Sequence, residues 1–255
     1  MITLGIDIGS ITTKAALMKD GTLLGARVGF TGYNIEKAWR HVTDELLDEL
    51  GLEFSATDRI VSTGYGRASV GVAHKSITEI TCHAAGAHFC APHIRSIIDI
   101  GGQDSKSIVI DENGRVKDFV MNDKCAAGTG RFLEVMARAL QVDLEEFGDI
   151  SLMAEKPGKI SSVCTVFAES EVISHISHGE SRENIIAGIH ESIAMRIAAM
   201  ANRVGVRSPL MMTGGVARNI GVVKALEKKL GMAIEVSEHA QVMGAIGAAV
   251  LAKDV

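Results

Sequence analysis

The chain has 255 residues, of which 26 are lysine or arginine and 31 are aspartate or glutamate, so its formal net charge is −5. Apolar residues make up 47% and charged residues 22%, which is typical of a folded globular protein and excludes a disordered one. The acidic balance, without a block of basic residues, argues against non-specific nucleic-acid binding. No apolar run approaches the roughly 20 residues of a membrane helix, and Asp7 interrupts the N-terminus where a signal peptide would be apolar. We therefore expect a cytoplasmic protein with no membrane or nucleic-acid partner.

Two segments, 5–18 and 97–110, have closely similar sequences. The aligned residues include Asp7 with Asp99, Gly9 with Gly101 and Lys14 with Lys106. An Asp-Gly dipeptide follows the first segment and an Asn-Gly dipeptide follows the second, and both favour two-residue hairpin turns. Each copy is therefore predicted to form a strand, a glycine-containing turn, a second strand, a hairpin and a third strand. The chain is expected to contain two similar halves.

The rest of the hydrophobic pattern predicts helices alternating with short strands. Helices are expected over residues 34–50, 78–89, 129–140, 166–177, 183–204, 219–230 and 242–252. Short strands are expected over residues 59–62, 210–212 and 233–236. This alternation is typical of an α/β protein. We place the boundary near Ser96, so that residues 1–95 form the first lobe and residues 96–255 the second.

Three glycine-containing turns that follow predicted strands have the composition of a phosphate-binding site. Glycine lets the backbone approach a phosphate closely, and successive N–H groups in a turn bind anions. The three turns contain Gly9, Ser10, Ile11, Thr12, Thr13 and Lys14, then Gly101 and Gly102, and finally Thr213, Gly214 and Gly215. Asp7 and Asp99, opposite each other at strand ends, would hold Mg²⁺ through its water ligands. Neither the P-loop pattern nor the GxGxxG pattern occurs, which disfavours a P-loop NTPase and a dinucleotide-binding domain.

These segments resemble the two phosphate motifs and the adenosine motif of the acetate kinase/sugar kinase/Hsp70/actin superfamily. The resemblance implies two ribonuclease-H-like lobes that close on ATP, as in the actin-like and Hsp70-like ATPases. Under that resemblance Gly214, Gly215 and Asn219 would bind adenosine, with Glu134 and Gln241 as weaker nucleotide contacts. Gln103 and Asp104, in the second phosphate turn, are candidates to orient or deprotonate the attacking water.

Cys125 and Cys164 each precede a predicted helix, where backbone N–H groups and the helix dipole favour a thiolate. Two thiolates are too few for a structural zinc site or an ordinary iron–sulfur cluster, which take four ligands, but a twofold homodimer would supply the missing pair. From chemistry alone, two buried and inert cysteines are the simpler interpretation. Cys82 and Cys90 are expected to be buried thiols on a helix, and His83 a packed or capping histidine.

Two cysteine-bearing strings give a more specific resemblance. Asn-Asp-Lys-Cys-Ala-Ala-Gly-Thr-Gly-Arg-Phe at 122–132 and Cys-Thr-Val-Phe-Ala-Glu-Ser-Glu at 164–171 resemble the activators of 2-hydroxyacyl-CoA dehydratases. These activators belong with the ATPases of benzoyl-CoA reductase systems, and the similarity extends along essentially the whole chain. The resemblance implies a homodimer in which Cys125 and Cys164 of both subunits hold one [4Fe–4S] cluster. Gly128 and Gly130, at the start of the following helix, would also touch the nucleotide.

The activity implied by this resemblance is electron transfer driven by hydrolysis of ATP to ADP. A ferredoxin or flavodoxin would donate one electron, and a low-potential iron–sulfur protein such as a dehydratase component would accept it. A double-cubane iron–sulfur protein is an alternative acceptor. An ordinary small-molecule kinase of the same fold and a non-enzymatic ATP-binding regulator are the alternative functions.

Overall fold

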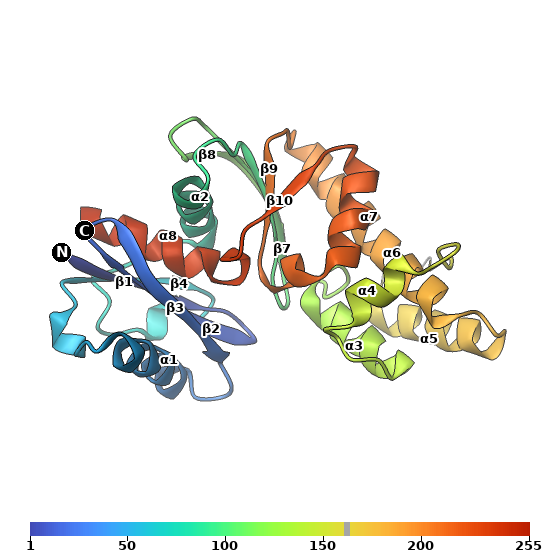
Figure 1. The fold of residues 1–255 in the computed structure, drawn as a ribbon, viewed down its shortest axis with the longest axis horizontal. Coiled ribbons are helices and arrows are strands. Elements are labelled where there is room, and N and C mark those ends of the chain that lie inside the picture. Colours follow the sequence, from blue (N-terminus) through green and yellow to red (C-terminus); the bar gives the residue numbers. More distant parts are fainter. Residues whose placement is uncertain (161–163) are drawn as a thin grey trace.

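Two five-stranded sheets with the same strand order organise the described residues, 1–160 and 164–255, of the computed structural model (Figure 1). The first sheet has the order β3-β2-β1-β4-β5 and the second the order β10-β9-β6-β7-β8. The strands of the first sheet are β1 (Ile2–Ile8), β2 (Thr12–Lys19), β3 (Thr22–Phe30), β4 (Arg59–Gly64) and β5 (Lys75–Ser76). Those of the second are β6 (Ser96–Ile100), β7 (Ser105–Ile110), β8 (Val116–Asn122), β9 (Leu210–Thr213) and β10 (Ile234–Val236). The predicted α/β class is confirmed. The repeat is confirmed as well, because strands β8, β7, β6, β9 and β10 occupy the same places in the second sheet as strands β3, β2, β1, β4 and β5 in the first.

Strand register is also repeated between the two sheets. Antiparallel pairing sets Asp7 opposite Lys14 in the first sheet and Asp99 opposite Lys106 in the second. Parallel pairing sets Asp7 beside Thr63, and Asp99 beside Thr213. Each central aspartate therefore lies near the carboxyl end of its strand, between a lysine and a threonine from the two neighbouring strands.

Most helices lie within one or two residues of their predicted bounds. They are α1 (Ile35–Leu50), α2 (Glu79–Cys90), α3 (Gly130–Leu140), α5 (Thr165–Ser177), α6 (Arg182–Arg203), α7 (Ile220–Leu230) and α8 (Met243–Leu251). The side chains of Asn34, Thr78, Ser181 and Asn219 accept a hydrogen bond from the third following backbone N–H, which explains where these helices begin. A short helix, α4 (Phe147–Leu152), was not predicted. No helix among the described residues has the length and apolarity to cross a membrane.

Helices α2 and α8 cross between the two sheets, in close contact (Figure 1). A Cβ atom at Gly247 would collide with the carbonyl of Cys82, and one at Gly86 with the carbonyl of Met243, so only glycine permits this approach. The C-terminal helix α8 packs on the first sheet, while α2 packs against Ile97 and other residues of the second. A boundary near residue 96 therefore separates the strands of the two sheets. It does not separate the helices, because α2 precedes the boundary but packs on the second sheet, and α8 follows it but packs on the first.

The helices of the second lobe form its larger core. Ile185, Ile186, Ile189 and Ile193 of α6 are buried among residues of α3, α4 and α7. In Figure 1, α5 lies at the far end of this lobe from the first sheet. The second lobe therefore has a helical extension that the first lobe lacks in the described part of the chain.

Candidate nucleotide-binding site

A cleft of about 400 Å³ lies between the lobes and is lined by residues of both. Among the predicted site residues it is lined by Asp7, Gly9, Ser10, Ile11, Thr12, Lys14, Asp99, Gly101, Gly102, Asp104, Gly130, Glu134, Gly214, Gly215, Asn219 and Gln241. These residues come from both repeats and from three later segments of the chain, 130–134, 214–219 and residue 241. The fold therefore brings the three glycine-containing turns to one cavity, with an aspartate from each central strand at its base.

Two predicted nucleotide contacts, Thr13 and Gly128, and one candidate for orienting the water, Gln103, lie elsewhere among the described residues. Thr13 is buried inside the first lobe, where its hydroxyl lies 2.9 Å from that of Thr31. The exposed Gln103 does not line the cleft, because its turn directs the following residue, Asp104, inward instead. Gly128 packs against the side chain of Arg196. The structure therefore does not bring these three residues into the cleft with the others, and their assigned roles stay predictions. Thr13 lies beneath the first phosphate turn, because Thr31 donates from its hydroxyl to the carbonyl of Gly9.

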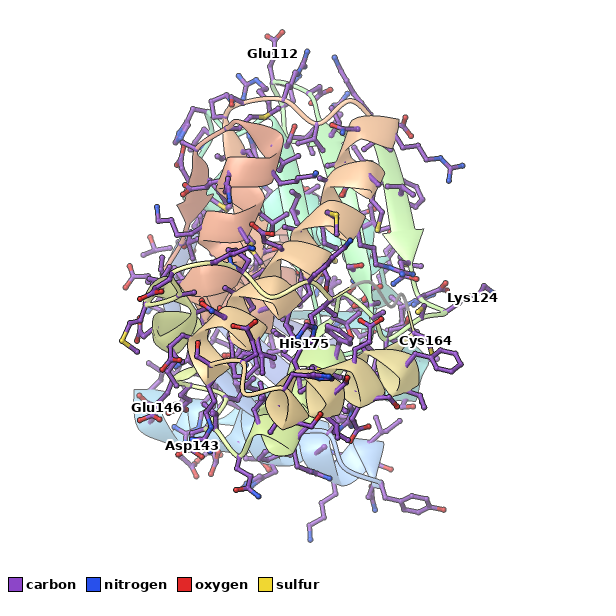
Figure 2. The ribbon with its side chains drawn as sticks, turned by 90° about the vertical axis from the view of Figure 1, so that its right-hand side faces the viewer. Glu112, Lys124, Asp143, Glu146, Cys164 and His175 are labelled. Atoms are coloured by element: carbon purple, nitrogen blue, oxygen red, sulfur yellow. The ribbon has the colours of Figure 1, made fainter. Side chains whose placement is uncertain are left out.

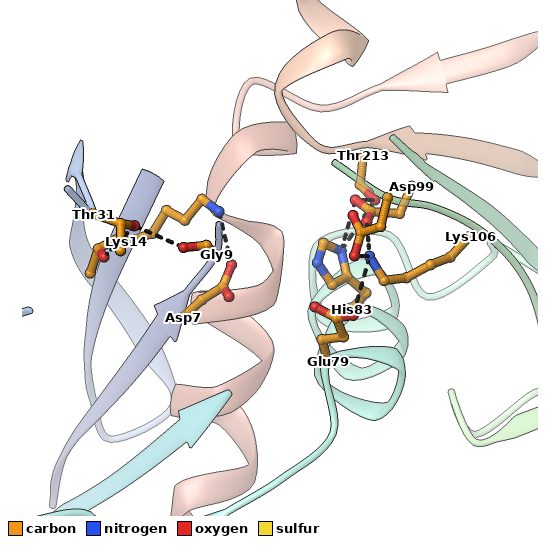
Figure 3. Close-up of polar contacts among 11 residues, drawn as sticks. Asp7, Gly9, Lys14, Thr31, Glu79, His83, Asp99, Lys106 and Thr213 are labelled. Atoms are coloured by element: carbon orange, nitrogen blue, oxygen red, sulfur yellow. Dashed lines mark hydrogen bonds and ion pairs between the residues drawn. The ribbon is translucent and has the colours of Figure 1, made fainter. Parts of the chain in front are cut away.

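The two aspartates of the repeat face each other across the cleft, each with its lysine (Figure 3). Lys14 Nζ lies 3.2 Å from Asp7 Oδ2 in the first lobe. Asp99 has three partners, because Lys106 Nζ donates to its Oδ2 at 3.0 Å, Thr213 Oγ1 donates to its Oδ1 at 2.9 Å and His83 Nδ1 lies 3.3 Å away. An ion held through its waters fits Asp7 better than Asp99, since the carboxylate oxygens of Asp99 are already bound.

Lys106 is the centre of a buried charge cluster. Its side chain is only 2% exposed, and its Nζ lies 3.0 Å from Asp99, 2.8 Å from Asp104 and 3.4 Å from Glu79. Burial opposes its charge, but the three carboxylates outweigh burial and raise the pKa of Lys106 above its usual value. Burial likewise opposes ionisation of Asp99, yet His83 and Lys106 hold its pKa well below the usual range. The cluster therefore carries ionised groups in a nearly water-free setting.

Sequence reasoning did not include Glu79 and Lys106 among the site residues. Lys106 could have been found, because it aligns with Lys14 in the repeat. Glu79 is the first residue of α2, and its position in the cleft depends on how α2 crosses the sheets. Burial raises the pKa of its carboxyl to about 7, against the opposing effect of Lys106. His83, expected to be a packed histidine, is buried, and its Nδ1 lies 3.2 Å from Thr213 Oγ1 and 3.3 Å from Asp99 Oδ1.

The second phosphate turn is joined to the start of α3. The amide of Gly130 donates to the carbonyl of Gly101 at 2.9 Å, and the amide of Arg131 donates to that of Gly102 at 2.8 Å. On its other side, Gly102 touches Ile11 of the first lobe. A Cβ atom added at Gly102 would lie only 2.6 Å from Cδ1 of Ile11. The first lobe, the second phosphate turn and the loop before α3 are therefore in direct contact.

The two predicted cluster ligands lie in the second lobe, outside the cleft. Cys164 is exposed and is the residue before α5, while Cys125 is half-buried in the loop before α3. Since α3 begins only at Gly130, the expectation that Cys125 directly precedes a helix is wrong. In the view of Figure 2, Cys164 and Lys124, the neighbour of Cys125, lie at the same edge of the molecule. Because Cys164 is exposed, the alternative prediction that Cys125 and Cys164 are two buried thiols is wrong.

The other two cysteines lie on α2, as expected, but differ in burial. Cys82 is fully buried, and burial raises the pKa of its thiol to about 12. Cys90, predicted to be buried, is only half-buried, because it is the last residue of the helix. No group of three or more His, Cys, Asp and Glu side chains within the described residues is arranged to hold a metal ion.

Comparison with known proteins identifies full-length relatives. The model of the BadF/BadG/BcrA/BcrD ATPase family matches residues 4–252. The activator of lactoyl-CoA dehydratase from Anaerotignum propionicum is 49% identical over 253 residues, covering 99% of this chain and 97% of that protein. The crystal structure of component A of Acidaminococcus fermentans (R)-2-hydroxyglutaryl-CoA dehydratase has a TM-score of 0.96 and 45% identity, covering 100% of this chain and 98% of that one. The activator of 2-hydroxyisocaproyl-CoA dehydratase from Clostridium difficile, with bound ADPNP, has a TM-score of 0.94 and 46% identity, covering 100% and 95%.

Proposed function

Because the chain belongs to the BadF/BadG/BcrA/BcrD ATPase family, we propose that it is the ATP-dependent reductase component that activates a 2-hydroxyacyl-CoA dehydratase. Its two-sheet architecture is the actin-like ATPase fold, and the cleft between the lobes has the residues that an ATP site needs. The single observation that carries the proposal is the full-length similarity to dehydratase activators at 45–49% identity. In this role, hydrolysis of ATP to ADP and phosphate drives an electron from a donor to a low-potential acceptor.

ATP would lie in the cleft with its phosphates between the two repeat turns. Backbone N–H groups of the turns at 9–12 and 101–102 would bind phosphate oxygens, and Lys14 would add a positive charge. Gly214, Gly215 and Asn219 would contact the adenosine, with Glu134 and Gln241 at the margin. Mg²⁺, when bound with ATP, would neutralise phosphate charge, and Asp7 is the carboxylate placed to hold its water ligands. The ADPNP bound to a 46% identical activator supports this assignment.

We assign activation of the hydrolytic water to Glu79. Among the acidic candidates, Asp104 is bound to Lys106 at 2.8 Å, and Asp99 accepts hydrogen bonds from Lys106 and Thr213. Glu79 lines the cleft, and because its pKa is about 7 it can accept a proton near neutral pH. Lys106, at 3.4 Å, would stabilise the carboxylate before the proton is taken.

The variant Glu79→Gln is expected to lower kcat for ATP hydrolysis about 100-fold, because the amide cannot accept the proton. In the native chain the rate is expected to rise with pH through about 7, where Glu79 ionises. Steady-state ATPase assays between about pH 5 and pH 9 would measure both effects. A variant that keeps the native rate and pH profile would contradict the assignment.

Stability gives an independent test of the same pKa. Because burial raises the pKa of Glu79 from 4.5 to about 7, the folded chain holds a proton that the unfolded chain has released between these values. The resulting stabilisation is complete below about pH 4.5 and is lost as the pH rises through about 7. The native chain should therefore lose free energy of unfolding between about pH 4.5 and pH 7, whereas Glu79→Gln, which does not titrate, should not lose this part. Urea unfolding of both proteins across this range measures the difference.

Nucleotide binding would reach the cysteine loop through the second phosphate turn. Ile11 presses on Gly102, and the carbonyls of Gly101 and Gly102 accept from the first amides of α3. Movement of the first lobe on binding ATP would therefore displace the start of α3 and the loop that contains Cys125. This contact path is our proposal for how hydrolysis controls electron transfer.

Gly102→Ala is expected to weaken binding of an ATP analogue about ten-fold, because the new methyl group would force Ile11 and its lobe away. Calorimetric titration would measure the dissociation constant. The double variant Gly102→Ala/Ile11→Ala removes the obstructing side chain and should recover most of the affinity. Failure of this rescue would show that the lobe contact does not control binding.

We further propose that two copies of the chain share one [4Fe–4S] cluster. Cys125 and Cys164 of each copy would provide its four thiolate ligands, and the cluster, when bound, supplies a one-electron carrier. Next to the exposed Cys164, helix α5 has exposed apolar side chains that a second copy would cover. These are Val166, Phe167, Ile173 and Ile176. Such a row on one helix is typical of an interface rather than of a solvated surface.

The electron donor would be a reduced ferredoxin or flavodoxin, and the acceptor an iron–sulfur protein, either a dehydratase component or a double-cubane protein. Anaerobic purification with iron analysis tests the proposal against an ordinary kinase of the same fold. We expect a brown dimer with about two iron atoms per chain, half of a four-iron cluster. ATP-dependent reduction of the dehydratase component should follow. A colourless monomer prepared without air that phosphorylates a small molecule would refute the reductase function.

A further inference from the structure

A buried histidine lies directly behind the adenosine end of the cleft. His190, on α6, is 1% exposed, and none of the functions assigned above uses it. Its Nε2 lies 3.4 Å from the side-chain amide nitrogen of Asn219, and its Nδ1 lies 3.0 Å from the hydroxyl of Ser151 on α4. The His190 side chain therefore connects α4 and α6 with Asn219, the residue that caps the start of α7.

Each hydrogen bond in this group has only one possible direction. The Ser151 hydroxyl donates to the carbonyl of Gly148 at 2.6 Å, so it must accept from His190 Nδ1–H. The unprotonated Nε2 then accepts from the Asn219 amide. Asn219 Oδ1 in turn accepts from the backbone N–H of Val222 at 3.0 Å. This sequence of donors and acceptors allows only one orientation of the Asn219 amide.

The surroundings also hold the imidazole in one position and one charge state. Phe147 contacts the ring edge-on, with centroids 5.5 Å apart. At Gly221 a Cβ atom would collide with both His190 Nδ1 and the Ser151 hydroxyl, so glycine is required for this approach. Burial lowers the pKa of His190 to about 3, and the ring is therefore neutral at physiological pH, as its acceptor role requires.

We propose that His190 is a positioning residue that fixes the Asn219 amide as a hydrogen-bond donor to the adenosine part of the nucleotide. The proposal rests on the ATP site proposed above. One N–H of the amide donates to His190, and the second has no partner among the described residues while Asn219 lines the cleft. The ligand atom it fits is an acceptor, such as a ribose oxygen or an adenine ring nitrogen. Without His190, only the bond from the Val222 N–H to Asn219 Oδ1 would still hold the amide, and its NH₂ group would be less firmly placed for the ligand.

A double-mutant cycle tests this role. His190→Phe keeps an aromatic ring beside Phe147 but removes both hydrogen bonds, and it should weaken binding of a non-hydrolysable ATP analogue about ten-fold. The loss should appear in the dissociation constant and in KM more than in kcat. In an Asn219→Ala background the same substitution should have almost no further effect on binding, because the group that it positions is absent. Calorimetric titration of all four proteins measures the coupling.

Ile193→Ala, on the same buried face of α6, is the matched control. It removes apolar contacts without removing a hydrogen bond, and it should lower thermal stability while leaving affinity for the analogue unchanged. If His190→Phe fails to fold, Ser151→Ala serves instead, because it releases the Nδ1–H and should weaken binding about three-fold.

Equal losses from His190→Phe in both backgrounds, or unchanged affinity in the single variant, would overturn the positioning role. Those results leave the ATP site itself intact. In contrast, a native chain that binds no ATP analogue would refute the proposed function.

Discussion

Lys106→Met is expected to abolish ATP hydrolysis and to lower the free energy of unfolding by about 3–5 kcal/mol, the usual cost of removing one partner from a buried ion cluster. Lys106 is the cation that Asp99, Asp104 and Glu79 share, and its side chain is 2% exposed. Without it, three carboxylates would remain close together away from water. Urea unfolding and an ATPase assay at neutral pH measure the two losses.

Lys14→Met is the matched control, because Lys14 is the repeat counterpart of Lys106. It contacts a single carboxylate at 3.2 Å and its side chain is 14% exposed, so it should cost less stability while still weakening nucleotide binding. The loss of unfolding free energy in Lys106→Met should also be smaller at acidic pH. There the carboxylates that Lys106 no longer neutralises can bind protons and become uncharged. A Lys106→Met protein as stable as the native chain at neutral pH would contradict the role of this cluster.

Cys125→Ser and Cys164→Ser are each expected to reduce bound iron from about two atoms per chain to nearly none, if two copies of the chain share a four-iron cluster. Serine is a poor ligand for iron in such clusters, and the loss of one thiolate per chain removes two of four ligands. ATP-driven electron transfer to the acceptor should be lost as well. Iron analysis, visible absorption and size-exclusion chromatography under anaerobic conditions measure these changes.

Cys90→Ala is the matched control for both cysteine variants. Cys90 is half-buried at the end of α2, so its replacement should leave iron content and the oligomeric state unchanged. The ATP site should also survive in Cys164→Ser, because the cleft is not lined by Cys164. Full iron content in Cys125→Ser or Cys164→Ser would refute the shared cluster.

Local sequence determined most helices, the three glycine-containing turns and every strand except the two-residue β5 (Lys75–Ser76). The alternation around Asp7 and Asp99 and the hairpin dipeptides reflect interactions between residues close together in the chain. The starts of the helices could also be predicted, because residues such as Asn34 and Thr78 accept a hydrogen bond from a backbone N–H within the first turn. The repeat then indicated that two similar sheets would place equivalent aspartates at one cleft.

Tertiary structure alone decided which distant segments meet. The uniformly apolar sequence of the C-terminal helix is typical of a buried helix, but it does not say which elements bury it. In the structure, close contacts at Gly86 and Gly247 set α8 against α2, and a close contact at Gly5 sets it against the first sheet. That crossing puts Glu79 beside Lys106 in the cleft and raises its pKa to about 7. Likewise, Thr13 is polar in sequence yet turns inward to Thr31, away from the cleft. The pattern of hydrophobic residues indicates whether a side chain is buried. The partners of that side chain and its charge state depend on packing between residues far apart in the chain.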